Sequence, residues 1–303
     1  MNYLKKLIVE PGSKVKLADI DPGFKGKHES HEEASPQIDA HIQELAHLQY
    51  LMYAEGKHAL LIVLQGLDAG GKDGVVNHVI SAMNPQGCKV TGFKQPTKED
   101  LAHDFLWRVH PHVPRKGEVA IFNRSHYEDV LVTRVHNLVP KKVWSKRYNR
   151  INDFEKLLAA NGTAILKFFL YISKEEQLER FKQRMDDPKR HWKISDSDYK
   201  EREYFDDYVA AFEDAFNETS TDYAPWFVIP SNHKWFRDLA ISQIIAETLE
   251  GLKMTFPAPT MNIDEIRKEY HAAEEEEKKE EEAAGKKKKK KKKKKGKKDK
   301  DRE

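Results

Sequence analysis

Apolar runs of strand length alternate along this chain with longer segments whose apolar residues recur at helical spacing. Strands are predicted over residues 59–65, 89–93, 118–122, 163–172 and 224–229. Helices are predicted over residues 37–55, 73–83, 98–109, 141–161, 173–185, 197–217 and 235–252. This alternation indicates an α/β fold with a parallel sheet and helices on both of its faces. The nearly continuous apolar run at 163–172 agrees with a strand that is covered on both sides.

Both ends of the chain lie outside this alternation. Residues 1–35 mix Pro, Gly and charged residues and are expected to form an irregular N-terminal arm before an α/β domain at 36–258. Residues 259–303 form a charged tail, with a short helix predicted at 261–271, an acidic stretch at 274–282 and an unbroken lysine run at 286–295. Blocks of like charge repel one another and bury no apolar surface, so we expect the tail to be largely disordered.

The 303-residue chain has a formal net charge of +3 that is unevenly distributed. Residues 286–303 hold thirteen Lys and one Arg against three acidic residues, a net charge of +11, so residues 1–285 carry −8. Cys88 is the only cysteine, which excludes a disulfide framework and a cysteine-based metal site. No segment approaches the ~18 apolar residues of a membrane span and no signal-peptide pattern is present, so we expect a cytoplasmic protein without a membrane partner.

The sequence GLDAGGKDG at 66–74 follows one predicted strand and leads into the next predicted helix. A glycine-rich turn of this kind that ends in Gly-Lys is typical of a P-loop, whose backbone N–H groups and helix N-terminus surround phosphate. Asp73 stands where Ser or Thr is usual and Asp68 adds a second carboxylate, which suits a divalent metal ion shared with phosphate oxygens. The alternative is an ordinary tight turn, which does not account for the cation Lys72 at a helix start. The candidate phosphate-binding residues are Gly66, Ala69, Gly70, Gly71, Lys72, Asp73 and Gly74.

A second loop, NRSHYED at 123–129, also follows a predicted strand. Ligands of parallel sheets bind beyond the carboxyl ends of the strands, so this loop and the P-loop should face one another. The guanidinium of Arg124 suits bidentate phosphate contacts, and Glu128 is in reach of a metal ion. The alternative is a surface ion pair of little energetic weight between these two residues. Arg134, further along the chain, is another candidate for phosphate binding.

Cations are concentrated around the predicted helix 173–185 and the connection that follows it. In a P-loop kinase, a cation-rich helical hairpin late in the chain is where a lid closes over phosphates and excludes water. We therefore predict a lid at about 174–200, in which Trp192 is placed to stack on a nucleobase. The alternative is a solvated basic helix face. The candidate lid residues are Arg180, Arg184, Lys189, Arg190, Trp192 and Lys193.

The chain resembles the second polyphosphate kinase family from about residue 50 to residue 256. The resemblance depends on GLDAGGKDG at 66–74, FLWR at 105–108, IFNRSHYEDVLV at 121–132, ILKFFLYISKEEQ at 165–177 and APWFVIP at 224–230. The second motif, NRSHYE, is similar to that of the subgroup acting on both nucleoside mono- and diphosphates. Asn123 stands where other subgroups have an aspartate.

The resemblance implies a P-loop kinase-like fold for residues 36–258 and reversible phosphoryl transfer from inorganic polyphosphate to AMP or ADP, with guanine nucleotides as further candidate acceptors. It implies Mg²⁺, or Mn²⁺ in its place, as cofactor, and a homo-oligomer, either a dimer or a tetramer. Carried over by position, Asp68 and Lys72 serve the P-loop, and Asp68 and Glu128 serve the metal. The catalytic set implied is Asp68, Lys72, Asn123, Arg124 and Glu128, and Arg180, Arg184 and Lys193 match the lid.

Two other functions are compatible with parts of the sequence. An ATP-dependent nucleoside monophosphate kinase would share the P-loop and the lid, but would normally keep Ser or Thr at position 73. A polyanion- or nucleic-acid-binding protein would use the lysine tail. The acidic body argues against nucleic acid as a partner, and no base-reading module is visible.

Overall fold

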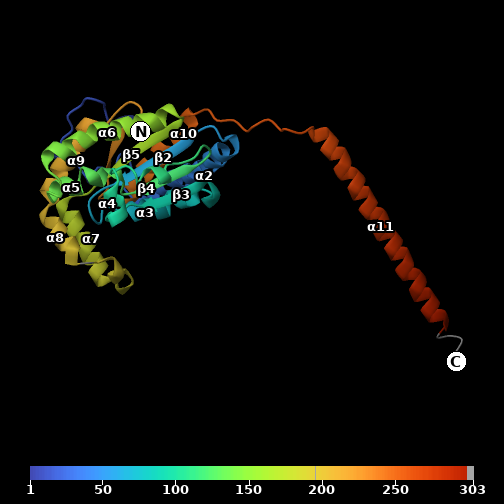
Figure 1. Ribbon diagram of the computed structural model, residues 1–303. Helices are drawn as coiled ribbons and strands as arrows, with labels where there is room; N and C mark the ends of the chain where they lie inside the picture. Colours follow the sequence, from blue (N-terminus) through green and yellow to red (C-terminus); the bar gives the residue numbers. More distant parts are fainter. Residues whose placement is uncertain (195, 299–303) are drawn as a thin grey trace. The chain divides into compact units, whose positions relative to one another are not determined.

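The computed structural model of the chain describes residues 1–194 and 196–298. A six-stranded sheet forms the centre of the unit Met1–Phe256, in the order β1-β6-β5-β2-β4-β3 (Figure 1). Every neighbouring pair is parallel except β1 and β6, which are antiparallel. The parallel sheet predicted from the sequence is therefore confirmed. The strands are β1 (Ile8–Val9), β2 (Ala59–Gln65), β3 (Cys88–Gly92), β4 (Val119–Asn123), β5 (Thr163–Tyr171) and β6 (Trp226–Pro230).

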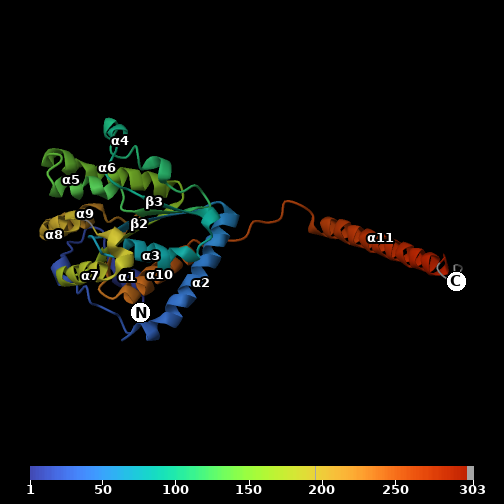
Figure 2. The same cartoon turned by 90° about the horizontal axis from the view of Figure 1, so that it is seen from below.

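Helices cover both faces of the sheet (Figure 2). Alternate residues of β2 point to opposite faces, since Leu60, Ile62 and Leu64 belong to one core and Leu61 and Val63 to the other. The first core is completed by residues of α2, α3 and α10, and the second by residues of α6 and α9. The helices of this unit are α1 (Tyr3–Lys6), α2 (His31–Glu55), α3 (Lys72–His78), α4 (Lys98–Ala102), α5 (Val132–Val135), α6 (Lys141–Ala160), α7 (Lys174–Asp186), α8 (Asp196–Glu203), α9 (Phe205–Thr219) and α10 (Lys234–Gly251).

The N-terminal arm is more ordered than the sequence predicts. It contains α1 and the edge strand β1, which pairs with β6, and it buries Tyr3 and Leu17 almost completely. Its last residues already belong to α2, because the side chain of Ser30 accepts a hydrogen bond from the N–H of Glu33 and caps the helix. The prediction started this helix after Pro36, which the structure accommodates inside the helix.

Three predicted helices are shorter or divided in the structure. The helix expected at 73–83 ends at His78, and the one expected at 98–109 ends at Ala102. The one expected at 197–217 is two helices, α8 and α9, that break at Tyr204. The lid region at 174–200 consists of α7, the 3₁₀ helix η6 (Pro188–Lys193) and the start of α8; residue 195 lies outside the described residues.

The tail belongs to a second unit, Pro257–Glu303, whose described residues include the helix α11 (Ile263–Lys298). This helix is longer than the one predicted at 261–271, and the largely disordered tail stays a prediction. Ala, Glu and Lys have high helix propensity, and Glu274 and Lys278 form an i,i+4 ion pair at 3.1 Å, which both favour a helix. Among the described residues, no helix is both long and apolar enough to cross a membrane.

Candidate active site

The P-loop connects the carboxyl end of β2 to the first turn of α3. Two of its glycines are required by their surroundings. Gly66 has φ +156°, and a Cβ there would lie 3.0 Å from the carbonyl oxygen of Leu170. Gly71 has φ +107°, and a Cβ there would lie 2.2 Å from the guanidinium of Arg237. The glycine pattern that predicted a P-loop is thus explained by positive φ and by close packing against neighbouring groups.

Lys72 folds back over the loop that precedes it. Its Nζ atom donates hydrogen bonds to the carbonyl oxygens of Gly66, at 2.7 Å, and Leu67, at 3.3 Å. Burial, and next the nearby cation of Arg124, lower the pKa of Lys72, while three carboxylates of the site act in the opposite direction. The ammonium therefore lies against the first residues of the loop that is predicted to bind phosphate.

The register of the sheet brings the second loop to the P-loop. Leu64 of β2 is paired with Asn123 of β4, the strand that leads into this loop. Asn123 Nδ2 donates a hydrogen bond to Asp73 Oδ1 at 2.9 Å, and Lys193 Nζ lies 3.4 Å from Asp73 Oδ2. Burial alone would raise the pKa of Asp73, but these two donors lower it below its usual value. Asp73 thus joins three segments that the sequence placed far apart.

Arg124 has φ +60°, a left-handed conformation that is uncommon for a residue other than glycine. Its guanidinium lies 3.0 Å from Asp68 Oδ1, so Arg124 pairs with the P-loop and the alternative of a surface ion pair with Glu128 is not what the structure shows. Glu128 lines the same cavity, and its pKa is raised by burial against the lowering effect of Arg124 and Lys72. The structure therefore brings Asp68, Lys72, Arg124 and Glu128 together, as predicted.

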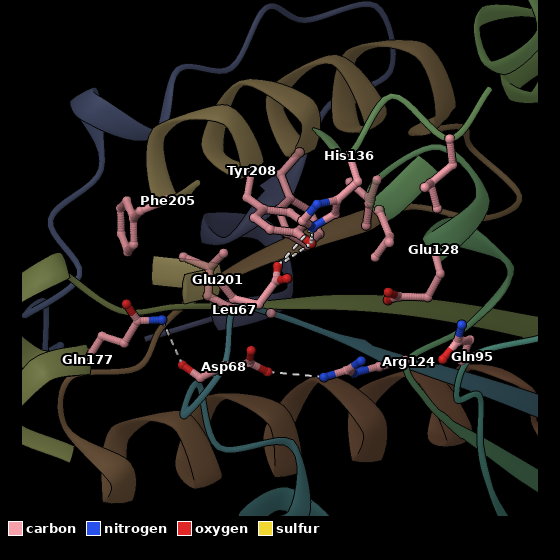
Figure 3. A pocket seen from close by; sticks show the side chains of 15 residues that line it. Leu67, Asp68, Gln95, Arg124, Glu128, His136, Gln177, Glu201, Phe205 and Tyr208 are labelled. Carbon is pink, nitrogen blue, oxygen red and sulfur yellow. Dashed lines mark hydrogen bonds and ion pairs between the residues drawn. The ribbon is translucent and has the colours of Figure 1, made fainter. Parts of the chain in front are cut away.

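A cavity of about 530 Å³ opens beside these residues (Figure 3). Its charged part includes Asp68, Arg124 and Glu128. The rest of its wall combines apolar side chains with polar ones. The apolar lining residues are Leu67, Leu131, Val132, Leu138, Phe205 and Phe212, and the polar ones are Gln95, His136, Gln177, Glu201 and Tyr208.

His136, Glu201 and Tyr208 were missed by the sequence prediction. They come from the end of α5, from α8 and from α9, so no spacing in the sequence connects them. A search for motifs does not find such a group, because only the packing of these helices against each other brings the side chains together.

The carboxylates of the cavity suit a metal ion that is held partly by substrate. Among the described residues, no group of three or more His, Cys, Asp or Glu side chains is arranged to hold a metal ion. Mg²⁺ is commonly bound by one or two carboxylates together with substrate phosphates and water. Asp68 and Glu128, which line one cavity, fit such a partial ligand set.

Arg180 has a different role from the one predicted. It is buried, and its guanidinium donates to the carbonyl oxygens of Ala69, at 2.8 Å, and Gly70, at 3.1 Å. Its remaining donors reach Glu176 and the carbonyl oxygens of Ser231 and Asn232. Since the protein itself uses these donors, Arg180 supports the P-loop from outside and does not act as a lid cation in this structure.

Arg134 also departs from its prediction as a phosphate-binding residue. It forms an ion pair with Asp214 at 2.6 Å, and its guanidinium lies 4.8 Å from the ring centre of Trp144. It is not among the residues that line the cavity. Although Arg134 is close to the second motif in the sequence, it does not belong to the site.

The other predicted lid residues lie on α7 and η6. Arg184 Nη1 donates to the carbonyl oxygen of Lys193 at 3.4 Å, and Arg190 pairs with Asp187 at 2.9 Å, while Lys189 is exposed. Trp192 is 78% exposed, with the ammonium of Lys193 4.9 Å from its ring centre. Lys193, through Asp73, is the predicted lid cation that contacts the P-loop helix.

A buried ion pair lies behind the second motif. Lys167 Nζ donates to Glu155 Oε2 at 2.6 Å, to the hydroxyl of Tyr127 at 2.9 Å and to the carbonyl oxygen of Thr219 at 2.7 Å. Glu155 Oε1 also lies 3.2 Å from His126 Nε2. All these side chains are fully buried, so the loop that carries Arg124 and Glu128 continues directly into a polar network in the core.

Known proteins resemble this chain over most of its length. The family model of polyphosphate kinase 2 matches residues 28–257. An AMP/ADP-polyphosphate phosphotransferase of Meiothermus ruber is 50% identical over 87% of this chain and 99% of its own, and an ADP-polyphosphate phosphotransferase of Rhodopseudomonas palustris is 44% identical over 84% and 93%. The crystal structure of polyphosphate kinase 2 from Arthrobacter aurescens superposes with a TM-score of 0.87, at 41% identity, covering 90% of this chain and 97% of that one. This chain belongs to the polyphosphate kinase 2 family.

Proposed function

We propose that this protein transfers a phosphoryl group from inorganic polyphosphate to AMP or ADP, reversibly and with Mg²⁺. The observation that carries the proposal is the cavity beside the P-loop, which combines a charged part with a group of Leu, Val and Phe side chains. The relatives named above support it, since both are named for polyphosphate and for adenine nucleotides.

The two parts of the cavity suit the two parts of a nucleotide. Polyphosphate has no apolar surface, so a wall of Leu, Val and Phe side chains is of no use to it and fits a nucleoside. The phosphates of that nucleotide would then point to Asp68, Arg124 and the P-loop. Polyphosphate would approach the transferred group from the side of the lid, where Lys193 and the other cations of η6 lie.

The chemistry requires little more than positioning and charge neutralisation. The acceptor phosphate is already ionised, so no strong general base is needed. Two like unit charges at ~4 Å repel by about 4 kcal/mol at an effective dielectric constant of 20. Lys72 and Arg124 offset this repulsion, and the lid excludes the water that would otherwise hydrolyse the donor. Mg²⁺, or Mn²⁺ in its place, would be held by Asp68 and Glu128 and would supply further neutralisation of the phosphate charge.

The proposal also covers guanine nucleotides as further acceptors and the cytoplasm as the place of action. Cys88 is unpaired, so the fold does not depend on an oxidising compartment.

The test is ATP formation from polyphosphate with ADP, and ADP formation with AMP, in the presence of Mg²⁺. Lys72→Ala and Asp68→Asn should each lower kcat by about 100-fold or more, because each removes a charged group from the transferred phosphate or its metal. Lys116→Ala and Asp222→Asn are matched controls, since both residues are exposed and neither lines the cavity. A near wild-type rate in either site variant with an intact fold would contradict the assignment.

The phosphoryl donor distinguishes the proposed function from that of an ATP-dependent nucleoside monophosphate kinase. The proposed function fails if the protein makes no triphosphate from polyphosphate and ADP but phosphorylates AMP from ATP.

A further inference from the structure

Three of the polar side chains that line the cavity contact one another. Glu201 Oε2 lies 3.0 Å from His136 Nε2 and 3.0 Å from the hydroxyl oxygen of Tyr208, and these last two atoms are 3.3 Å apart (Figure 3). The three residues belong to α8, to the end of α5 and to α9. No motif or relative's name assigns a role to this group.

The contacts fix which atoms carry protons. A carboxylate oxygen only accepts, so the close approach of His136 Nε2 means that this nitrogen carries a hydrogen. Burial, and next the charge of Glu201, raise the pKa of Tyr208, so its hydroxyl stays protonated and donates. Glu201 Oε2 therefore accepts two hydrogen bonds, which hold the carboxylate in one orientation.

The second carboxylate oxygen is left for a ligand. Within residues 1–194 and 196–298, no hydrogen bond to Glu201 Oε1 is found, although Glu201 lines the cavity. Apolar side chains, among them Leu138 and Phe205, line the same cavity. A fixed acceptor in a cavity that also has apolar lining favours a ligand that brings a hydrogen-bond donor on an apolar ring, and its negative charge repels phosphate. This wall thus rejects polyphosphate and suits a nucleobase.

We propose that Glu201 selects the nucleobase, with Oε1 accepting a hydrogen bond from the exocyclic amino group of adenine. This inference rests on the proposed function, since it takes a nucleotide as the occupant of the cavity. Adenine carries an amino group at the position where guanine and hypoxanthine carry a carbonyl oxygen, and two acceptors facing one another repel. Guanine has two neighbouring N–H donors elsewhere, but a single remaining oxygen cannot serve both. His136 and Tyr208 are positioning residues that act through Glu201.

The variant Glu201→Gln gives a test with a predicted sign. The two donors, His136 Nε2 and the Tyr208 hydroxyl, select the amide oxygen at the place of Oε2. The amide NH₂ then occupies the place of Oε1, and a donor replaces the acceptor that faces the base. This substitution should weaken the binding of adenine and favour the binding of a base with a carbonyl oxygen at that position.

The measurement is direct binding of three nucleotides by calorimetry, in the absence of polyphosphate. The wild type should bind ADP about tenfold or more tightly than purine riboside 5′-diphosphate, which lacks the amino group, because a hydrogen bond to a charged acceptor is lost. In Glu201→Gln this difference should disappear, and the preference for ADP over inosine 5′-diphosphate should fall at least about tenfold. Tyr208→Phe should move both ratios in the same direction by a smaller factor, because one of the two orienting donors remains.

Glu203→Gln is the matched control. Glu203 lies two positions away on α8, is exposed and does not line the cavity, so the same charge change there should leave all three affinities unaltered. The inference would be overturned if loss of the amino group lowered the nucleotide affinity by the same factor in the wild type and in Glu201→Gln. It would also be overturned if Glu201→Gln weakened ADP but not 2′-deoxy-ADP, since Glu201 would then read the ribose. These binding results do not depend on turnover. A failure of the proposed function, seen as no ATP formation from polyphosphate, can therefore be distinguished from a failure of this inference.

Discussion

Replacement of Lys167 by Met should reveal the buried charge of Glu155. In the wild type the two side chains are fully buried and paired at 2.6 Å, and Lys167 makes two further hydrogen bonds. Met is similar in length and apolar, so the substitution leaves the volume filled and removes only the cation. Glu155 then keeps a negative charge in the core, beside His126 and the Tyr127 hydroxyl.

The expected loss of unfolding free energy is large. Breaking a buried ion pair by removing one partner costs about 3–5 kcal/mol. For a folded unit of this size, this corresponds to a fall in Tm of roughly 6–20 °C. The double variant Lys167→Met/Glu155→Gln removes the stranded charge, keeps hydrogen-bonding groups beside His126, and should be more stable than the single variant by about 2 kcal/mol or more. Thermal and urea unfolding of the three proteins give these values.

The difference in stability between the wild type and Lys167→Met should depend on pH with a definite sign. Burial by itself raises the pKa of Glu155, but the Lys167 ammonium and His126 bring it below the usual value. A lowered pKa in the folded state stabilises the fold above the unfolded pKa, and this contribution is lost as pH falls through the folded value. Without Lys167 the pKa of Glu155 rises and the folded variant takes up a proton. The stability difference between wild type and Lys167→Met should therefore shrink as pH is lowered from about 7 to about 5.

Two results would refute this reasoning. The single and double variants could be equally stable at every pH, in which case no charge is stranded in the core. Alternatively, the stability difference could grow on acidification, in which case Glu155 does not take up the proton.

Two further predictions concern the P-loop support and the tail. Arg180→Lys keeps the charge, but a lysine cannot reach all four carbonyl oxygens that Arg180 contacts. The P-loop should therefore be displaced, and we expect kcat in a steady-state assay to fall roughly 10- to 100-fold. A wild-type kcat would contradict this expectation. Truncation after Gly285 removes a net charge of +11 and should leave kcat unaltered while it flattens the dependence of the polyphosphate KM on salt concentration. An unaltered salt slope would show that the tail does not attract the polymer, and a parallel titration with DNA tests nucleic acid as its partner.

The charged site was predictable because it is built from contiguous motifs at strand ends. Gly66–Gly74 and the second motif each follow a buried strand, and parallel strands bring their carboxyl ends to one edge of the sheet. Asp68, Lys72, Arg124 and Glu128 could therefore be placed together from local pattern and topology alone.

The roles of individual cations were not predictable in the same way. Arg180 and Arg134 have the same charge as Lys193, but Arg180 donates to P-loop carbonyl oxygens and Arg134 pairs with Asp214, whereas Lys193 reaches Asp73. Charge and position in the sequence do not say whether a guanidinium is already occupied by the protein. That is decided by which carbonyl and carboxylate oxygens the fold brings within hydrogen-bond distance.

Sequence by itself determined the parallel α/β sheet, the P-loop and the family, because periodicity and glycine placement act over a few neighbouring residues. Tertiary structure alone decided that the N-terminal arm adds the edge strand β1 and that His136, Glu201 and Tyr208 share one cavity wall. Those features depend on contacts between elements far apart in the chain, where many different side chains would satisfy the local pattern equally well.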